Sequence, residues 1–247
     1  MLNRKWFVLF VFSLFLTGCA ATGGLFHSQA SSPPHPLPMD LGITACDTEI
    51  SASVVGLIIP GSKESWLKNA PWDEYIVTIE NRSDKPFVVL KIYLIDPRSI
   101  QIDGTLSPSE IEKVSKVLSN EYKKIGIAVA VTYAPAAIFL TTGSLGVLAF
   151  GPLALIAGPA YYFGKTWHDT KNREKVEAEF NRRRFQLPFK QEANSKSSGS
   201  VFFPIVPNPK LLVIEYRKDG DDKTLEISLE KLAGLHVAPK ESEKKQE

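Results

Sequence analysis

Two parts of the chain alternate between apolar and polar residues, and a long apolar run separates them. In the first part, residues 43–106, an alternating segment at 75–80 and an apolar segment at 87–95 flank a group of turn-forming residues. The second part, residues 201–235, contains two further alternating segments around an Asp-Gly turn. Alternation with a period of two is typical of strands with one buried face. Because a two-stranded hairpin alone is only marginally stable, we predict that both parts build one β-sandwich, divided by an insertion.

Residues 107–190 form this insertion, which we predict to be a helical hairpin with an apolar tip. Ser107 and Glu110 have the spacing of a capping box at a helix start, and an apolar stripe at helical spacing follows. The run 125–164 contains no charged residue and no histidine. Turn-type residues at 141–144 divide this run into two arms, each about as long as one membrane crossing requires. No break signal precedes the first arm, so we expect the first helix to continue into it.

Small residues recur at intervals of four on both arms. They are Gly126, Ala130 and Ala134 on the first arm, and Ala154 and Gly158 on the second. Residues four apart share one helix face, and small residues allow two helices to approach closely in a membrane. We predict that these residues pack the hairpin in a membrane; the alternative is a buried helical pair sealed by other protein.

The N-terminus has the pattern of a secretory signal. Arg4 and Lys5 precede an apolar run at 6–16, and Leu16-Thr17-Gly18-Cys19 closes it. A charged start followed by a short apolar run is typical of a signal peptide, and this run is too short to span a membrane. The closing motif resembles the lipobox of bacterial lipoproteins and matches it at every position. The alternative is an ordinary signal peptide with a chance cysteine.

The lipobox resemblance implies how the chain is processed and where it is located. In bacterial lipoproteins the cysteine thiol receives a diacylglycerol, the signal peptide is cleaved before that cysteine, and the new amine is acylated. The resemblance therefore implies a signal peptide at 1–18 and lipidation, for example with palmitate, at Cys19. In that family an Asp after the cysteine is associated with inner-membrane retention, so Ala20 implies an outer-membrane anchor facing the periplasm. The Ser- and Pro-rich residues 19–42 are predicted as a tether.

The sequence of strand, turn and strand at 75–95 resembles the immunoglobulin-like β-sandwich modules of envelope proteins. Such a sandwich has ~100 residues, which is close to the combined size of the two alternating parts. The expected fold class is α+β: an immunoglobulin-like β-sandwich interrupted by a long helical hairpin insertion with an apolar tip. Residues 191–200 are predicted as a flexible linker and 236–247 as a charged tail.

The charge of the chain is nearly balanced. Subtracting 27 acidic from 29 basic residues leaves a net charge of +2. Such a chain has no overall field that attracts nucleic acid, so no nucleic-acid partner is predicted. The second predicted helix, residues 165–184, ends in Arg182-Arg183-Arg184. We expect this cluster to be a solvated helix end that complements the helix dipole; contact with lipid headgroups or an acidic partner is the alternative.

No motif for catalysis, cofactor binding or metal binding is recognisable. The adjacent pair His168-Asp169 is expected to be solvated on a charged helix, and an envelope hydrolase using this pair is the enzymatic alternative. With Cys19 lipidated, Cys46 has no partner within the chain, and we predict that it is a small buried hydrophobe. The four histidines are dispersed, at positions 27, 35, 168 and 236.

Together these features predict a lipid-anchored periplasmic envelope protein that is not an enzyme. It would act as an adaptor or structural component of an envelope complex, with an envelope protein or further copies of the same chain as partner. Its membrane contact would be the N-terminal lipid, supplemented by the run 125–164 if that run enters the membrane. The alternative is an oligomeric transport or secretion-channel component whose apolar hairpin enters the membrane.

Overall fold

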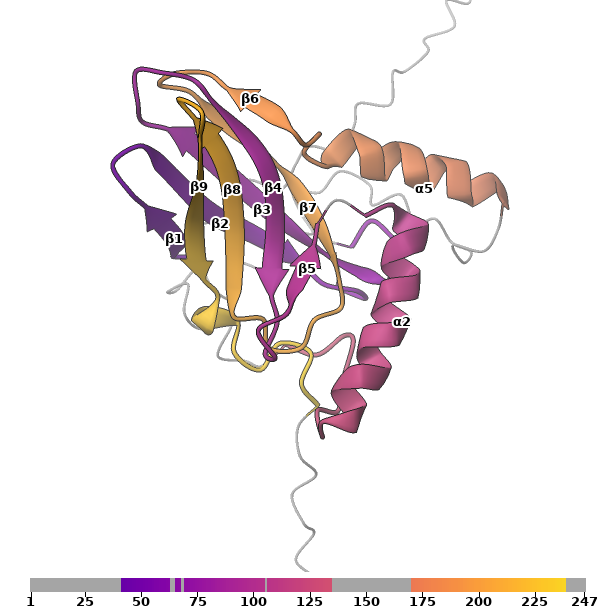
Figure 1. The fold of residues 1–247 in the computed structure, drawn as a ribbon. Helices are drawn as coiled ribbons and strands as arrows, with labels where there is room; N and C mark the ends of the chain where they lie inside the picture. Colours follow the sequence, from indigo (N-terminus) through magenta and orange to yellow (C-terminus); the bar gives the residue numbers. More distant parts are fainter. Residues whose placement is uncertain (1–40, 63–64, 68, 105, 135–169, 239–247) are drawn as a thin grey trace, which may run out of the picture. The chain divides into compact units, whose positions relative to one another are not determined.

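The computed structural model describes five segments of the chain, all within the compact unit Pro33–Glu247: residues 41–62, 65–67, 69–104, 106–134 and 170–238. Their strands form two antiparallel sheets packed as a sandwich (Figure 1). Sheet A has the order β1-β2-β3-β7, and sheet B has the order β5-β4-β8-β9 with β6 beside β4. The strands are β1 (Ile43–Cys46), β2 (Ile50–Ile58), β3 (Trp72–Asn81), β4 (Phe87–Ile95), β5 (Gln101–Asp103), β6 (Phe189–Gln191), β7 (Lys196–Pro204), β8 (Leu211–Lys218) and β9 (Asp221–Ser228).

Strands from both predicted parts lie side by side in each sheet. In sheet A, β7 pairs with β3 from Pro204 opposite Trp72 to Lys196 opposite Glu80. In sheet B, β8 pairs with β4, and β4 spans the predicted segment 87–95. The prediction of one two-sheet sandwich built from both parts of the chain is therefore confirmed.

The main core lies between the two sheets and consists of the inward-facing alternate residues. On β3 these include Tyr75 and Ile79, and on β8 they include Leu212 and Ile214, all of them fully buried. Complete burial of one such side chain is worth about 1.5–3 kcal/mol relative to exposure. The alternation that predicted these strands is thus the alternation that fills the core.

The helix α2 (Pro108–Lys124) begins with the predicted capping box. The backbone N–H of Ser107 donates to Glu110 Oε2 at 2.8 Å, and the N–H of Glu110 donates to Ser107 Oγ at 3.4 Å. The two residues satisfy each other's backbone donors at the helix start. Pro108 at the first helical position needs no such partner, because it has no N–H.

At its other end α2 stops at Lys124, which differs from the expectation that it continues into the first arm. Gly126 has a φ of +82°, and its N–H donates to the Lys123 carbonyl at 3.0 Å. The N–H of Ile127 donates to the Tyr122 carbonyl at 2.9 Å. This pair of hydrogen bonds is the Schellman C-cap, for which glycine is favoured because it adopts the left-handed conformation without a Cβ clash.

After α2 the chain crosses one end of the sandwich without forming a helix. We call this the basal end; it is where β2, β4, β7 and β9 finish. Here Val129 pairs with Val237 in an antiparallel bridge. The N–H of Ala130 donates to the His236 carbonyl at 2.9 Å, and the N–H of His236 donates to the Tyr133 carbonyl at 2.8 Å. Hydrogen bonds to residues 236–238 therefore replace the helical hydrogen bonds that the sequence predicts.

The prediction of a long helical hairpin is therefore not supported by the described residues. Gly126, Ala130 and Ala134 do not share a helix face, because α2 ends before them. The other predicted packing residues, Ala154 and Gly158, lie outside the described residues. No helix within the described segments has the length and apolar character needed to cross a membrane.

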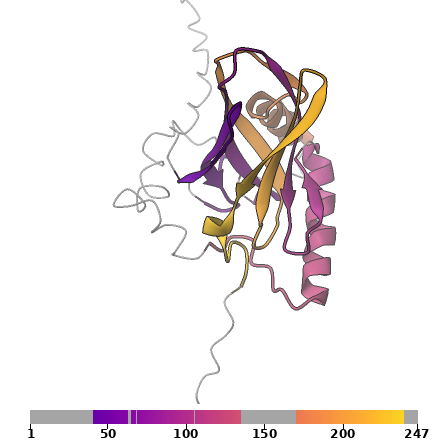
Figure 2. The ribbon, with the colours of Figure 1, turned by 60° about the vertical axis from the view of Figure 1, so that its left-hand side comes forward.

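The second described helix, α5 (Thr170–Arg183), does not run alongside α2. It lies crosswise to α2, since it appears lengthwise in Figure 1 and nearly end-on in Figure 2, whereas α2 is seen from the side in both. Both helices contribute to a second core against the outer face of sheet A. In this core Phe180 of α5 stacks on Phe202 of β7 with ring centroids 4.1 Å apart, and Ile111 of α2 is fully buried. Each helix therefore packs on the sheet rather than as one stem of a hairpin.

Two segments predicted to lie outside the sandwich belong to it. Residues 196–200 of the predicted linker form the first half of β7. Gly199 leaves room for the Phe185 ring: a Cβ on this residue would lie 3.0 Å from the ring, which would have to shift. At the start of the predicted tail, His236 is fully buried and residues 236–238 are hydrogen-bonded to the crossing segment.

Candidate interaction face

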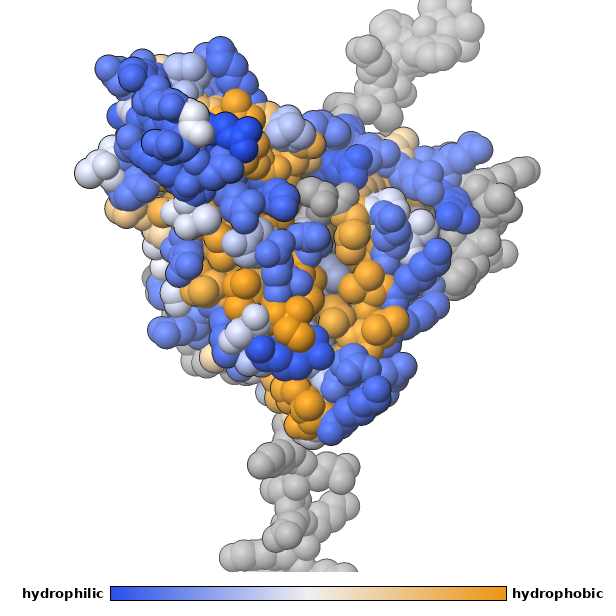
Figure 3. Space-filling model, viewed as in Figure 1, coloured by the Kyte–Doolittle hydropathy of each residue, from blue (hydrophilic) through white to orange (hydrophobic). Residues whose placement is uncertain are grey.

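The two outer faces of the sandwich are covered differently. α2, α5 and the β2–β3 connection cover the outer face of sheet A, where Trp66, Trp72 and Phe180 are buried. No described element covers the outer face of sheet B, which faces the viewer in Figure 1. Figure 3 shows an apolar area on this face, bordered by hydrophilic residues. We call the uncovered face, made of the outward residues of β4, β5, β8 and β9, the interaction face.

Pairing between the strands places the residues of the interaction face in rows. In the central row Tyr93 of β4 lies between Asp103 of β5 and Val213 of β8, and Val213 lies opposite Glu226 of β9. In the next row toward the basal end, Ile95 lies opposite Leu211. Tyr93, Ile95 and Leu211 are half-buried, whereas Asp103 and Glu226 are exposed. The face therefore has an aromatic and aliphatic centre with a carboxylate at each side.

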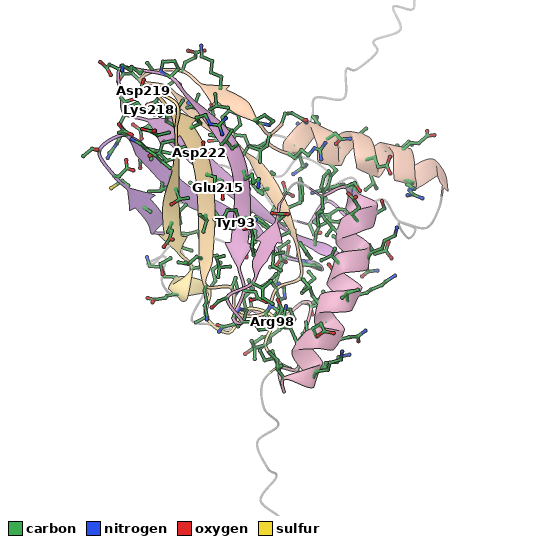
Figure 4. The ribbon with its side chains drawn as sticks, viewed as in Figure 1. Tyr93, Arg98, Glu215, Lys218, Asp219 and Asp222 are labelled. Carbon is green, nitrogen blue, oxygen red and sulfur yellow. The ribbon has the colours of Figure 1, made fainter. Side chains whose placement is uncertain are left out.

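The electrostatic environment of Tyr93 is acidic. Burial raises the pKa of the Tyr93 hydroxyl above its ordinary value, and the carboxylates of Glu215, Glu226 and Asp103 raise it further. Glu215 has the largest effect of the three carboxylates, and Figure 4 shows Tyr93 and Glu215 on the same face. The only lysine of β4 and β8 close to this group is Lys91, which lies directly opposite Glu215 in the sheet. A positively charged group placed over Tyr93 would thus meet three carboxylates and the edge or face of an aromatic ring.

An open hollow of about 520 Å³ lies at the basal end of the interaction face. Its apolar wall is formed by the strand-end residues Ile95 and Leu211, and its polar wall includes Lys210 and Glu230. The Nζ atom of Lys210 lies 3.5 Å from Ser99 Oγ. Among the described residues no carboxylate lies within ion-pair distance of Lys210. The hollow is large enough for side chains of a partner.

The arginine cluster at the end of α5 is divided between surface and interior: Arg182 is exposed, Arg184 is half-buried and Arg183 is buried. Glu74 of β3 is buried and accepts hydrogen bonds from Trp66 Nε1 at 2.8 Å and from Ser200 Oγ at 2.6 Å. Arg183 is also buried and lies 3.4 Å from Glu74. Hydrogen bonds from Arg182 and then from Arg183 lower the pKa of Glu179 to about 2, against the effect of burial. The predicted solvated end therefore fits Arg182 but not Arg183, whose partner is the buried Glu74. Contact of Arg182 with lipid headgroups or an acidic partner stays the alternative prediction.

A second buried ionisable pair lies at the basal end. His236 Nε2 is 2.9 and 3.0 Å from the two carboxylate oxygens of Asp73, and both side chains are buried. Asp73 lies on the inner face of β3, two residues before the buried Tyr75. Because a catalytic group must reach its substrate, this enclosed pair is assigned a structural role that holds residues 130 and 236 against β3.

The residues predicted from motifs are not in the interaction face. Cys19, His168 and Asp169 lie outside the described residues. Cys46 is exposed and free at the end of the edge strand β1, so the prediction of its burial is wrong. In the part of the chain that the structure describes, no group of three His, Cys, Asp or Glu side chains could hold a metal ion.

Tyr93 belongs to no recognisable motif, but the sequence around it contains a signal for the uncovered face. The segment 87–95 is apolar at positions that face both sides of the sheet, including Leu90 and Ile95 on the outer side. Such a run predicts a strand covered on both faces. The structure leaves the outer face uncovered, which makes these apolar residues available to a partner.

Comparison of the chain with protein-family models, with curated proteins and with solved structures finds no match. The comparisons therefore add no family to the description of the fold. The function has to be inferred from the chemistry of the interaction face and from the sequence motifs.

Proposed function

We propose that this protein is a lipid-anchored, non-enzymatic adaptor of the bacterial envelope whose interaction face binds a protein partner. The observation that carries this proposal is the uncovered outer face of sheet B, on which Tyr93, Ile95 and Leu211 are only half-buried. Apolar surface bordered by polar residues is typical of protein interaction sites, and tyrosine is enriched in them. The lipobox ending at Cys19 supports anchoring at the outer membrane, facing the periplasm. The two antiparallel sheets support the finer proposal of an immunoglobulin-like module.

The partner is expected to present a basic side chain to this face. Asp103, Glu215 and Glu226 surround Tyr93 with negative charge. An arginine or lysine over a tyrosine ring gains cation–π attraction of about 0.5–2 kcal/mol, and the carboxylates add charge-assisted hydrogen bonds. An apolar residue beside that basic residue would contact Ile95 and Leu211 at the edge of the hollow.

Photo-crosslinking in cells tests this assignment. A photoreactive amino acid at Thr224, an exposed β9 residue opposite Glu215, should give one discrete adduct with another protein. The same group at Ala178, which is exposed on α5, serves as the matched control and should give none. The variant Glu226→Lys should lower the Thr224 adduct about fivefold or more, because it places a like charge against the partner. Purified Glu226→Lys should unfold in urea like the parent chain, because Glu226 is exposed.

Three results would count against the adaptor. The first is an equal yield of adduct from Thr224 and from Ala178. The second is a yield at Thr224 that Glu226→Lys leaves unchanged. The third is an adduct with twice the mass of the chain itself. The last result would indicate contact between copies, as in an oligomeric transport component. Anchoring is tested separately, since Cys19→Ser should remove acyl labelling and release the protein from membranes.

A further inference from the structure

Exposed aliphatic side chains collect at the basal end of the sandwich. The described residues include four large hydrophobic side chains that are strongly exposed. Three of them belong to segments at the basal end: Ile100 is 47% exposed, Ile125 is 54% exposed and Val131 is 43% exposed. The fourth, Val117, is 59% exposed and lies in the middle of α2. Three separate segments therefore each expose an aliphatic side chain at the same end of the domain, which is typical of a surface that contacts something apolar.

The β4–β5 turn is held rigidly against the end of α2. Tyr122 of α2 donates a hydrogen bond from its hydroxyl to Asp96 Oδ2 at 3.0 Å. Arg98 Nε donates to the same carboxylate oxygen at 2.7 Å, and the Arg98 guanidinium lies 4.6 Å from the centre of the Tyr122 ring. Asp96 Oδ1 accepts the backbone N–H of Ile100 at 2.8 Å, which fixes the turn that exposes Ile100. Ile100 and Ile125 are therefore held at the same end of the molecule by a buried polar network.

Val131 is fixed at this end by a different set of contacts. The segment that carries it is pinned by the bridge between Val129 and Val237. Its neighbour Ala130 accepts a hydrogen bond from the ring of His236 at 3.3 Å. The exposure of Val131 is thus a property of an ordered crossing segment.

Lysines border these aliphatic residues. Lys123 and Lys124 are exposed in the last turn of α2, directly before Ile125. Lys124 pairs with Glu121 at 2.7 Å on the surface, whereas no described carboxylate pairs with Lys123. Lys210 lies on the β7–β8 connection at the same end. Figure 3 shows apolar surface at this lower tip next to hydrophilic residues of α2.

From this arrangement we infer that the basal end contacts the surface of a lipid bilayer. Aliphatic side chains flanked by lysines match a bilayer interface, where the former enter the acyl boundary and the latter meet anionic headgroups. A protein partner fits less well, because lysine is depleted and aromatic residues are enriched at protein interfaces. In the sequence, the uncharged run 125–164 also begins at this end. The inference rests on the proposed anchorage, which would keep the domain near a membrane.

An environment-sensitive fluorophore tests the contact. The lipidated full chain carrying Cys46→Ser is labelled at Ile125→Cys or, as the matched control, at Val117→Cys, and placed in vesicles of phosphatidylethanolamine and phosphatidylglycerol at 3:1. A lipid-borne quencher should quench the fluorophore at 125 about threefold more than the fluorophore at 117. Adding Lys123→Glu and Lys124→Glu should weaken the contact by about fivefold per lysine, and the quenching at 125 should fall accordingly.

The outcomes separate the inference from the anchorage. Chains that float with the vesicles but show equal quenching at 125 and 117 would keep the anchor and overturn the contact. Chains that do not float at all would overturn both. A change of fluorescence at 125 that depends on protein concentration and not on lipid would assign the basal end to a second copy, and would also overturn the inference.

Discussion

Removal of the charge on Asp73 should reverse the pH dependence of stability. Burial lowers the pKa of His236, but the charge and hydrogen bond of Asp73, with the carbonyls of Ala130 and Val131, outweigh that effect and raise it above its ordinary value. Burial raises the pKa of Asp73, although His236 opposes this. A histidine whose pKa is higher in the folded state binds its proton more tightly there. The stability that protonated His236 adds is therefore complete below its unfolded pKa of ~6.5. That stability is lost as the pH rises through the pKa of His236 in the folded state.

In Asp73→Asn the imidazole of His236 stays buried but loses its anionic partner. Burial alone lowers its pKa, so the unfolded chain now binds the proton more tightly and stability should rise with pH instead of falling. At pH 5.5 the cost should approach the ~3–5 kcal/mol expected for one partner removed from a buried ion pair. At pH 8 the imidazole is closer to neutral and can hydrogen-bond to the new amide, so the cost should fall to about 1–2 kcal/mol.

Urea unfolding at both pH values measures the difference, followed by the fluorescence of the buried Trp66 and Trp72. The slope of the unfolding free energy against urea concentration should be the same for the parent chain and the variant. Differences between their unfolding midpoints then report differences in stability. Asp84→Asn, in the exposed β3–β4 turn, is the matched control and should change little at either pH. A cost for Asp73→Asn that is equal at the two pH values, or larger at pH 8, would refute the ion pair.

Two further predictions concern the helices. Glu179→Gln should make the stability of the fold less dependent on pH in acid. The Glu179 carboxylate has a pKa of about 2 in the folded state, so the stability it contributes is lost as the pH falls from about 4.5 to 2. An acid unfolding transition that is unchanged by circular dichroism would contradict this. Gly126→Ala should cost about 1 kcal/mol, since its φ of +82° is unfavourable for alanine while no atom lies within 4 Å of the added Cβ. A loss well above ~2 kcal/mol by thermal unfolding would mean that space, rather than backbone conformation, limits this position.

The local rules of the sequence predicted the strands and one helix end, because those features depend on neighbouring residues. The apolar run at 87–95 and the turn before it defined β4, and Ser107 with Glu110 defined the start of α2. The other end of α2 was missed. Gly126 was interpreted as part of a small-residue face, although a glycine after lysines in the last turn is also a C-cap signal.

The partners of each surface were decided only by the tertiary structure. The apolar stripe of α2 and the buried residues of α5 show that each helix packs on something, but not that both pack on sheet A. The linker composition at 196–200 did not indicate a strand, because its pairing with β3 joins residues more than a hundred positions apart. The same distance separates Tyr93 from Glu215 and Glu226, and Asp73 from His236. Local propensity acts between near neighbours along the chain, whereas burial and charge act between neighbours in space, so the acidic environment of Tyr93 exists only once the strands are paired.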